Sequence, residues 1–185
     1  MPRTPLQFQQ MKDERKLSIL ESALFLFAVH GKNISIDMIC QKAKCSHGLA
    51  YHYFKNVDQI YDELLSSETY KNLYSFLDVF NFSNEAFLQV VEAVKKLVNI
   101  VKEPRITVAF AKIIISDETK NSFYSHFVKL VSQGQKEGTV TGGNSSDIVG
   151  SFFYLIKGLY LTILNEKHPN IKVPSIDNIL NIFIR

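Results

Sequence analysis

The side chains with the greatest capacity for chemistry in this chain are gathered between residues 46 and 53. Hydroxyl and imidazole groups follow one another there, carried by Ser46, His47, Tyr51 and His52. Such groups donate and accept hydrogen bonds, which suits them to phosphate oxygens and base edges. The sequence has no nucleophile elbow, glycine-rich phosphate loop, His-Glu metal pair or pair of carboxylates in an apolar setting. The pattern therefore favours binding of a polyanion over catalysis.

Two short helices joined by a turn are predicted to present these side chains. Ser35 can cap a helix over residues 36–43, in which apolar residues recur at the spacing of a half-buried helix. After the turn, Ser46 can cap a second helix that ends near Tyr53. Two capped helices joined by so short a turn form a helix-turn-helix. A third helix start follows at Asn56, which forms a capping-box pattern with Gln59.

The second of these helices is predicted to turn its polar side outward. Ala50 faces inward, while Gly48, at a cost of about 1 kcal/mol in helix propensity, would let the helix approach the bases closely. Leu49 can contact a thymine methyl group, and Ser46 marks a helix N-terminus suited to phosphate. The residues predicted to contact DNA are Ser35, Lys44, Ser46, His47, Gly48, Leu49, Tyr51, His52, Tyr53 and Lys55.

Each of these roles has a plainer alternative. Tyr53 could be a core tyrosine, and His47 could simply be solvated. Lys44 and Lys55 could be ordinary surface charges, although they bracket the exposed helix.

The segment from Ala43 to Ile60 resembles the signature of TetR-family transcriptional regulators. The resemblance is carried by Ser46, Gly48 and the run YHYFKN over residues 51–56, and by the run LFLF over residues 24–27 followed by His-Gly. It covers roughly the first third of the chain. Four residues depart from the family pattern: Lys44 stands where Gly is usual, His47 and Val57 where Lys is frequent, and Leu49 where Thr is frequent.

The resemblance implies an all-α protein of about nine helices in two domains. Residues 1–56 would form a three-helix DNA-binding domain, and residues 57–185 a helical domain for effector binding and dimerisation. A homodimer would place two reading helices in successive major grooves of double-stranded DNA, so a palindromic operator is expected. A small apolar or aromatic effector would release the DNA, which makes the protein a ligand-responsive repressor.

Capping residues and apolar periodicity predict the helices of the whole chain. The first helix ends at Gly31 and begins either at Pro5, behind a Thr4-Gln7 capping box, or near Asp13. The fourth is predicted to run without interruption from Val57 to about Phe80, as a rod that can transmit a tilt. Five later helices are predicted, over residues 85–102, 104–115, 117–138, 147–168 and 175–184. Ser83 and Asn84 precede the first of them, and the others start at Pro104, Asp117, Ser146-Asp147 and Ser175. The helix that starts at Ser146-Asp147 is predicted to end near His168.

The helix that begins near Asp147 is apolar nearly all round, so more than its own domain is expected to cover it. Pairing with its two-fold mate is favoured over burial inside a monomer. The predicted interface residues are Phe152, Phe153, Ile156, Tyr160, Ile163, Ile179 and Ile182. Aromatic residues that could line an effector cavity are Phe76, Phe87, Phe110, Phe123, Phe127 and Phe152, most of which would serve the core.

Composition narrows the class of protein further. The 185 residues are 46% apolar, no apolar run has the length of a membrane span, and the N-terminus lacks a signal-peptide pattern, so a cytoplasmic protein is expected. Residues 1–60 hold eight lysines and arginines against five aspartates and glutamates, whereas the remainder holds thirteen of each. The excess positive charge thus lies where phosphate binding is predicted.

Other interpretations of these motifs are weaker. Cys40, Cys45, His47 and His52 match no compact zinc finger in spacing, so no metal and no cofactor are predicted. Cys45, ahead of a helix N-terminus, could be a redox thiol, but a small apolar turn residue is favoured. Two functions stand beside DNA binding: a helical protein of this kind that acts through protein partners, and a small-molecule enzyme, which the absence of catalytic motifs disfavours.

Overall fold

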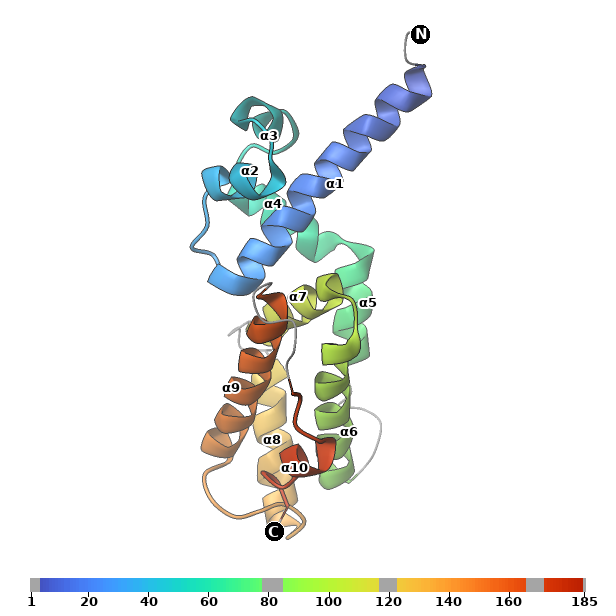
Figure 1. Ribbon diagram of the computed structural model, residues 1–185. Helices are drawn as coiled ribbons and strands as arrows, with labels where there is room; N and C mark the ends of the chain where they lie inside the picture. Colours follow the sequence, from blue (N-terminus) through green and yellow to red (C-terminus); the bar gives the residue numbers. More distant parts are fainter. Residues whose placement is uncertain (1–3, 78–84, 117–122, 166–171, 185) are drawn as a thin grey trace. The chain divides into compact units, whose positions relative to one another are not determined.

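The computed structural model describes residues 4–77, 85–116, 123–165 and 172–184, and its contacts divide the chain into two compact units, residues 1–71 and 72–185. All regular structure in these ranges is helical, with ten α-helices and one short 3-10 helix (Figure 1). The prediction of an all-α protein with an N-terminal helix-turn-helix is confirmed. The number of helices exceeds the predicted nine because the fourth is divided, as described below.

The first unit is built on α1 (Pro5–His30). Thr4 accepts a hydrogen bond from the Gln7 amide, and the Gln7 side chain accepts one from the Thr4 amide. This capping box confirms the start at Pro5 and excludes the alternative near Asp13. Gly31 ends the helix with a φ of 62°. Among its residues, burial begins only at Ile19, so the first part of α1 extends past α2 (Ile36–Ala43) and α3 (His47–Tyr53) in Figure 1.

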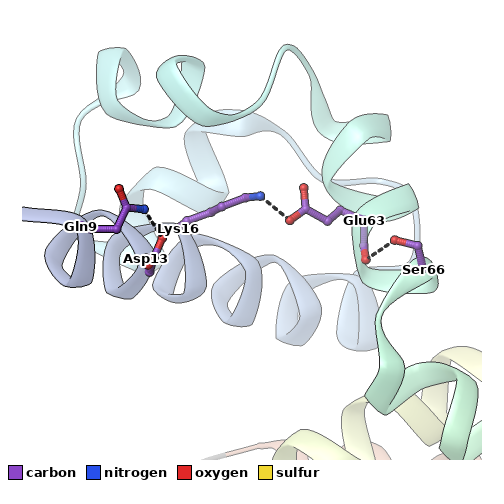
Figure 2. A network of polar contacts seen from close by, with 5 residues as sticks. All are labelled: Gln9, Asp13, Lys16, Glu63 and Ser66. Atoms are coloured by element: carbon purple, nitrogen blue, oxygen red, sulfur yellow. Dashed lines mark hydrogen bonds and ion pairs between the residues drawn. The ribbon is translucent and has the colours of Figure 1, made fainter. Parts of the chain in front are cut away.

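Polar and aromatic contacts hold α4 (Val57–Ser66) against α1. Figure 2 shows Lys16 of α1 paired with Glu63 of α4. The Lys16 Nζ atom lies 2.6 Å from Glu63 Oε1 and 5.6 Å from the centre of the Phe54 ring. The rings of Phe27 and Tyr61 meet edge to face at 4.8 Å. These contacts fix the helix that follows α3, and so support α3 from its C-terminal side.

The predicted uninterrupted fourth helix is wrong. It stops at Ser66, Ser67 adopts an extended conformation (φ −62°, ψ 147°), and a new helix α5 (Glu68–Leu77) follows. The Ser67 hydroxyl donates to the Leu64 carbonyl oxygen at 2.6 Å and accepts from the Tyr70 amide at 3.2 Å. A serine that caps both helix ends can break a helix without proline or glycine. The predicted end at Phe80 lies outside the described residues.

The second unit contains α6 (Ala86–Asn99), the 3-10 helix η1 (Ile100–Lys102), α7 (Arg105–Ile114), α8 (Phe123–Lys136), α9 (Ser145–Leu164) and α10 (Ile176–Leu180). In it, α6 packs on α8 and α10, and α9 packs on α7 and α8. Three aromatic rings form the centre: Phe127 stacks on Phe152 at 5.4 Å, and Phe183 lies 5.7 and 5.3 Å from them. Buried aliphatic side chains from α6 and α7, such as Val90, Leu97 and Ile114, complete the core around these rings.

Helix boundaries in this unit follow the sequence signals with local differences. Pro104 precedes α7 and Ser175 caps α10, as predicted. The cap of α9 is Asn144, whose side chain accepts from the amides of Ser146 and Asp147 at 2.9 and 3.2 Å. Helix α9 ends at Leu164, and α10 stops at Leu180 instead of Ile184. The predicted boundaries at Ser83, Asn84, Asp117 and His168 lie outside the described residues.

Helix α9 has the 20-residue length and the hydropathy of 1.5 that a membrane span would need. Phe152, Ile156 and Tyr160 are fully buried inside the unit, while 33% of the apolar window is buried in all. The core helix of a globular protein can have the same length and hydropathy, so these two properties are weak evidence for a membrane span.

Candidate nucleic-acid interface and effector cleft

The turn between α2 and α3 sets the direction of α3, which is the helix predicted to contact DNA and is called the reading helix below. The Ser35 hydroxyl accepts from the Met38 amide at 3.2 Å and begins α2. Lys44 ends it in the left-handed conformation, with φ 51° and ψ 46°, the one positive φ among the described residues other than glycine. Cys45 then leads directly to Ser46, whose hydroxyl accepts from the Leu49 amide at 3.3 Å. Both predicted caps are therefore formed.

Two buried side chains fix α3 to the interior of the first unit. Ala50 has an exposed fraction of 0% and Phe54 of 1%. Asn56 caps α4 by accepting from the Gln59 amide at 2.8 Å, while the Gln59 side chain accepts from the Lys55 amide, at 2.7 Å, instead of the Asn56 amide. Burial thus anchors α3 at its middle, through Ala50, and directly after its C-terminal end, through Phe54.

The structure brings the predicted DNA-contacting residues to one surface, formed by α3 and the turns on either side of it. Most of the ten are exposed, including Tyr51 at 57%. The exposed members are Ser35, Lys44, Ser46, His47, Gly48, Tyr51, His52 and Lys55, and the half-buried members are Leu49 and Tyr53. We call these ten residues the reading surface.

Gly48 leaves an open position in the middle of this surface. A Cβ atom placed there would meet no atom of the chain within 4 Å. The glycine is therefore required neither for packing nor for a left-handed backbone, and it costs helix propensity. Its bareness is useful only if something outside the chain approaches the helix closely.

Asp37 belongs to this site and was not predicted from the sequence. Its Oδ1 atom lies 3.4 Å from Nδ1 of His47, which joins the first turn of α2 to the first turn of α3. Both side chains are largely exposed. The carboxylate orients the imidazole and adds a negative charge beside a surface that is otherwise free of acidic groups. Only the crossing of the two helices creates this contact, so no pattern in the sequence reports it.

The six aromatic residues predicted to line an effector cavity are mostly core residues. Phe110, Phe123, Phe127 and Phe152 have exposed fractions of 6% or less. Phe87 is half-buried, and Phe76 is 50% exposed, with Lys96 Nζ 4.4 Å from its ring centre. The rings of Phe123 and Phe152 both pack against the ring of Phe127.

A cleft of about 620 Å³ opens elsewhere in the second unit, between the end of α7, the start of α8 and α9. This volume suits a small ligand. The lining residues are Ile115, Tyr124, Ser125, Ser146, Asp147, Gly150, Ser151, Phe153, Tyr154 and Lys157. None of the six predicted aromatic residues is among them. Sequence reasoning missed this set because its members are mostly polar and spread over three helices.

The walls of the cleft combine aromatic faces with charge. The Tyr124 hydroxyl donates to the Ser146 carbonyl oxygen at 2.9 Å and so fixes one wall. Lys112 lies near Lys157 and donates to the Ser116 hydroxyl at 2.9 Å; burial, together with the Lys157 charge, lowers the pKa of the Lys112 ammonium group. The lining itself thus carries one positive charge, on Lys157, and one negative charge, on Asp147, with the Lys112 charge nearby.

The residues predicted for a dimer interface lie on the inner side of the helices. Phe152, Phe153, Ile156, Tyr160 and Ile179 have exposed fractions of 2% or less inside their own unit, and Ile163 and Ile182 are half-buried. Packing within the chain leaves the first five no surface for a partner. The outer side of α9 carries Ser151, Tyr154, Gly158 and Leu161, with Tyr154 77% and Leu161 37% exposed. These four residues are called the outer face of α9.

Among the residues that the structure describes, no three side chains of histidine, cysteine, aspartate or glutamate come together as they would to hold a metal ion. Cys40 and Cys45 are both free thiols.

No family model and no curated protein matches the chain. Among solved structures, it is similar to a Clostridium perfringens protein described as a regulator of fatty acid metabolism, with 18% identity, a TM-score of 0.58, and 89% of this chain and 96% of that one covered. It is similar to a TetR-like transcriptional regulator from Rhodococcus sp. RHA1, with 14% identity, a TM-score of 0.57, and 91% and 92% covered. The hemolysin II transcriptional regulator HlyIIR has 15% identity, a TM-score of 0.56, and 94% and 99% covered. At these identities the likeness shows the fold, which is that of the TetR-like regulators.

Proposed function

We propose that this chain, which has the fold of the TetR-like regulators, is a transcriptional regulator that binds double-stranded DNA through its reading surface. The observation that carries the proposal is the contrast between the buried side and the exposed side of α3. Its buried side is anchored by Ala50 and Phe54, while hydroxyl, imidazole and ammonium groups surround the bare Gly48 on its other side. Packing within the chain explains why Ala50 and Phe54 are buried, but it does not explain the polar groups around Gly48. Those groups are explained if α3 fits into a major groove of DNA.

The reading surface supplies contacts of two kinds. Lys44, Lys55 and the hydroxyl of Ser35 flank α3 and suit phosphate oxygens, which position the protein on the duplex. His47, Tyr51 and His52 stand on the exposed side of α3, where they can reach base edges or phosphates. A protein bound in this way loses affinity steeply as salt rises, because each neutralised phosphate releases counterions.

A homodimer would double this site. Two copies of α3 on one duplex need a separation of about 34 Å, one helical turn, and imply a palindromic operator. The outer face of α9 supports the proposal as the contact between copies, since Tyr154 and Leu161 are large apolar residues that the chain leaves uncovered. The functional division proposed is residues 1–56 for DNA and 57–185 for effector and partner, in a cytoplasmic protein without catalytic activity.

Release by a small effector completes the proposal and makes the regulator a repressor. The cleft at α7, α8 and α9 supports a ligand with an aromatic or apolar body beside Tyr124 and Phe153, and a polar or anionic group near Lys157. The divided fourth helix changes how such a signal would travel: Ser67, between α4 and α5, is a joint at which one helix can turn against the next. A coupling of about 1–3 kcal/mol between the two sites would suffice.

Selection of duplexes from a random pool by the purified chain tests the DNA-binding proposal. We expect a palindromic sequence whose affinity falls on the order of a thousandfold between 50 and 200 mM salt. Tyr51→Phe should weaken binding to this duplex, whereas Tyr74→Phe, a matched change at a tyrosine that is 42% exposed on α5, should not. Two results together would refute DNA binding: no sequence is enriched, and the amount of duplex that the chain retains does not depend on salt. They would favour the alternative of a helical protein that acts through protein partners.

A further inference from the structure

Two thiols meet at the turn that aims the reading helix. The Cys45 amide donates to the Cys40 carbonyl oxygen at 3.0 Å, and the Lys44 amide donates to the Gln41 carbonyl oxygen at 3.4 Å. With Lys44 in the left-handed conformation, these two bonds form a Schellman motif. In this motif the side chain that follows the left-handed residue contacts the one five positions earlier. Here those two side chains are Cys45 and Cys40.

The backbone geometry permits a bond between the two sulfur atoms. A 3.0 Å hydrogen bond from the Cys45 nitrogen to the Cys40 oxygen, combined with standard bond lengths, keeps the two Cα atoms within about 7 Å. Disulfides usually join Cα atoms separated by about 4.4–6.8 Å. This backbone bond brings the two side chains to the same turn. Burial, followed by a hydrogen bond with the Cys45 thiol, raises the pKa of the Cys40 thiol to about 11.

The two sulfur atoms differ in access to solvent. Cys45 is half-buried at the surface of the turn, whereas Cys40 has an exposed fraction of 3%. A soluble oxidant therefore reaches Cys45 first. Cys40 then stands behind it, protected from the oxidant and in contact with the sulfur that has reacted.

We propose that Cys40 and Cys45 are a modification site at which a peroxide forms an intramolecular disulfide, and that this bond weakens DNA binding by the reading surface. The second part rests on the proposed function, while the first part does not. The site makes α3 responsive to oxidation through the turn that precedes it.

The reaction balances with one molecule of hydrogen peroxide. The Cys45 thiolate attacks one peroxide oxygen, the O–O bond breaks, and hydroxide leaves, so that Cys45 becomes a sulfenic acid. The Cys40 sulfur then attacks the Cys45 sulfur, the S–O bond breaks, and the thiol proton leaves with the hydroxyl group as water. The two cysteines lose two electrons and two protons in total, and the peroxide becomes two molecules of water. Added thiols reverse the oxidation by exchange at the accessible Cys45 sulfur.

A disulfide here would move the start of α3. Bond formation draws the two sulfur atoms from non-bonded contact to about 2.0 Å. Packing in the interior fixes the position of Cys40, so bond formation displaces Cys45. Ser46, the N-cap of α3, is the next residue and moves with Cys45. His47 is the next residue and loses its position relative to the bases. We expect the affinity for the selected duplex to fall by about tenfold or more, which corresponds to the loss of a base contact.

The test uses the full chain and two independent measurements. After treatment with hydrogen peroxide, intact mass should fall by about 2 Da, and alkylation in denaturant should label no thiol in place of two. Affinity for the selected duplex should fall and return after dithiothreitol. Cys45→Ser should show neither the mass change nor the loss of affinity. Cys40→Ala is a second control, which remains informative at Cys45 through alkylation even if its fold is weakened.

Each contrary outcome overturns a defined part of the proposal. Two thiols that remain open to alkylation after peroxide, or a disulfide that joins two chains on a non-reducing gel, would exclude the intramolecular bond. A disulfide that forms without any loss of affinity would exclude the effect on α3. If the reduced chain fails to bind any duplex, the proposed function and the effect on DNA binding fail together, while the mass measurement still decides the disulfide.

Discussion

The hydroxyl of Tyr160 donates a hydrogen bond to the carbonyl oxygen of Leu97 at 2.6 Å, across 63 residues of sequence and with Tyr160 fully buried. Leu97 lies in the last turn of α6, where carbonyl groups have lost their partners within the helix. The tyrosine therefore supplies a bond that the end of α6 would otherwise lack, and it ties α9 to α6 in the interior of the second unit.

Tyr160→Phe should lower the free energy of unfolding by about 1–3 kcal/mol, because the buried Leu97 carbonyl loses its donor. Urea denaturation measures this as a lower midpoint with an unchanged slope. Tyr51→Phe is the matched control for stability, since Tyr51 is 57% exposed and its hydroxyl can bond to water. Equal midpoints for Tyr160→Phe and the wild type would show that this bond contributes nothing net.

The same tyrosine predicts a pH dependence in the alkaline range. Burial raises the pKa of the Tyr160 hydroxyl, so its folded environment favours the neutral phenol. The stabilisation is present in full below the pKa of an unfolded tyrosine, about 10, and is lost as pH rises beyond it. The wild type should thus lose stability above pH 10 faster than Tyr160→Phe. Parallel curves for the two proteins between pH 9 and about 11 would contradict the prediction.

Gly48→Ala should change stability and DNA affinity in opposite directions. Alanine restores about 0.5–1 kcal/mol of helix propensity, and its methyl group meets nothing in the chain, so the midpoint of unfolding should rise. On DNA the same methyl group holds α3 away from the groove and should weaken binding to the selected duplex. The salt dependence should stay unchanged, because no charge is lost. A variant that is more stable and binds equally well would show that α3 does not approach a partner closely at this position.

Lys44→Gly separates charge from close approach. Lysine in the left-handed conformation is strained by about 1 kcal/mol or more, and glycine removes that strain, so stability should rise. Loss of a phosphate contact should reduce the salt slope of DNA binding by about 1 per subunit, unlike Gly48→Ala. Lys129→Gln, at an exposed lysine on α8, serves as a charge-matched control. An unaltered slope for Lys44→Gly would mean that Lys44 touches no phosphate.

Local chemistry made much of the first unit predictable. The caps at Thr4, Ser35, Ser46 and Asn56 depend on side chains that bond to amides within a few residues, so the sequence contains all the partners. The exposed side of α3 followed from the same periodicity, because a seven-residue helix has few ways to bury Ala50. These residues position most of the reading surface.

Features that depend on packing between distant elements were not predictable in this way. Ser67 breaks a helix whose apolar spacing continues through it, and the break is evident only from its extended backbone and its two hydrogen bonds. Helix α9 is apolar on most sides, so its sequence does not tell which side meets α7 and α8. The contact between Asp37 and His47 depends on the crossing of α2 and α3. The sequence therefore predicted the elements of the site but neither its acidic neighbour nor the cleft.

The outer face of α9 predicts the oligomeric state. Gly158 stands on it with no atom of the chain within 4 Å of an added Cβ atom, beside Leu161, so a second helix could approach closely there. Gly158→Glu and Leu161→Glu should each convert a dimer of twice the 21.2 kDa chain mass into a monomer, because a two-fold contact would face two carboxylates. Sedimentation equilibrium measures the mass, and urea denaturation checks that the second unit is still folded. Leu88→Glu on α6, at a leucine 46% exposed, is the control and should remain dimeric. Monomeric variants should also lose most of their affinity for a palindrome, since each half-site then binds one chain alone. A wild-type chain that is monomeric at micromolar concentration and still selects palindromes would contradict the dimer proposal.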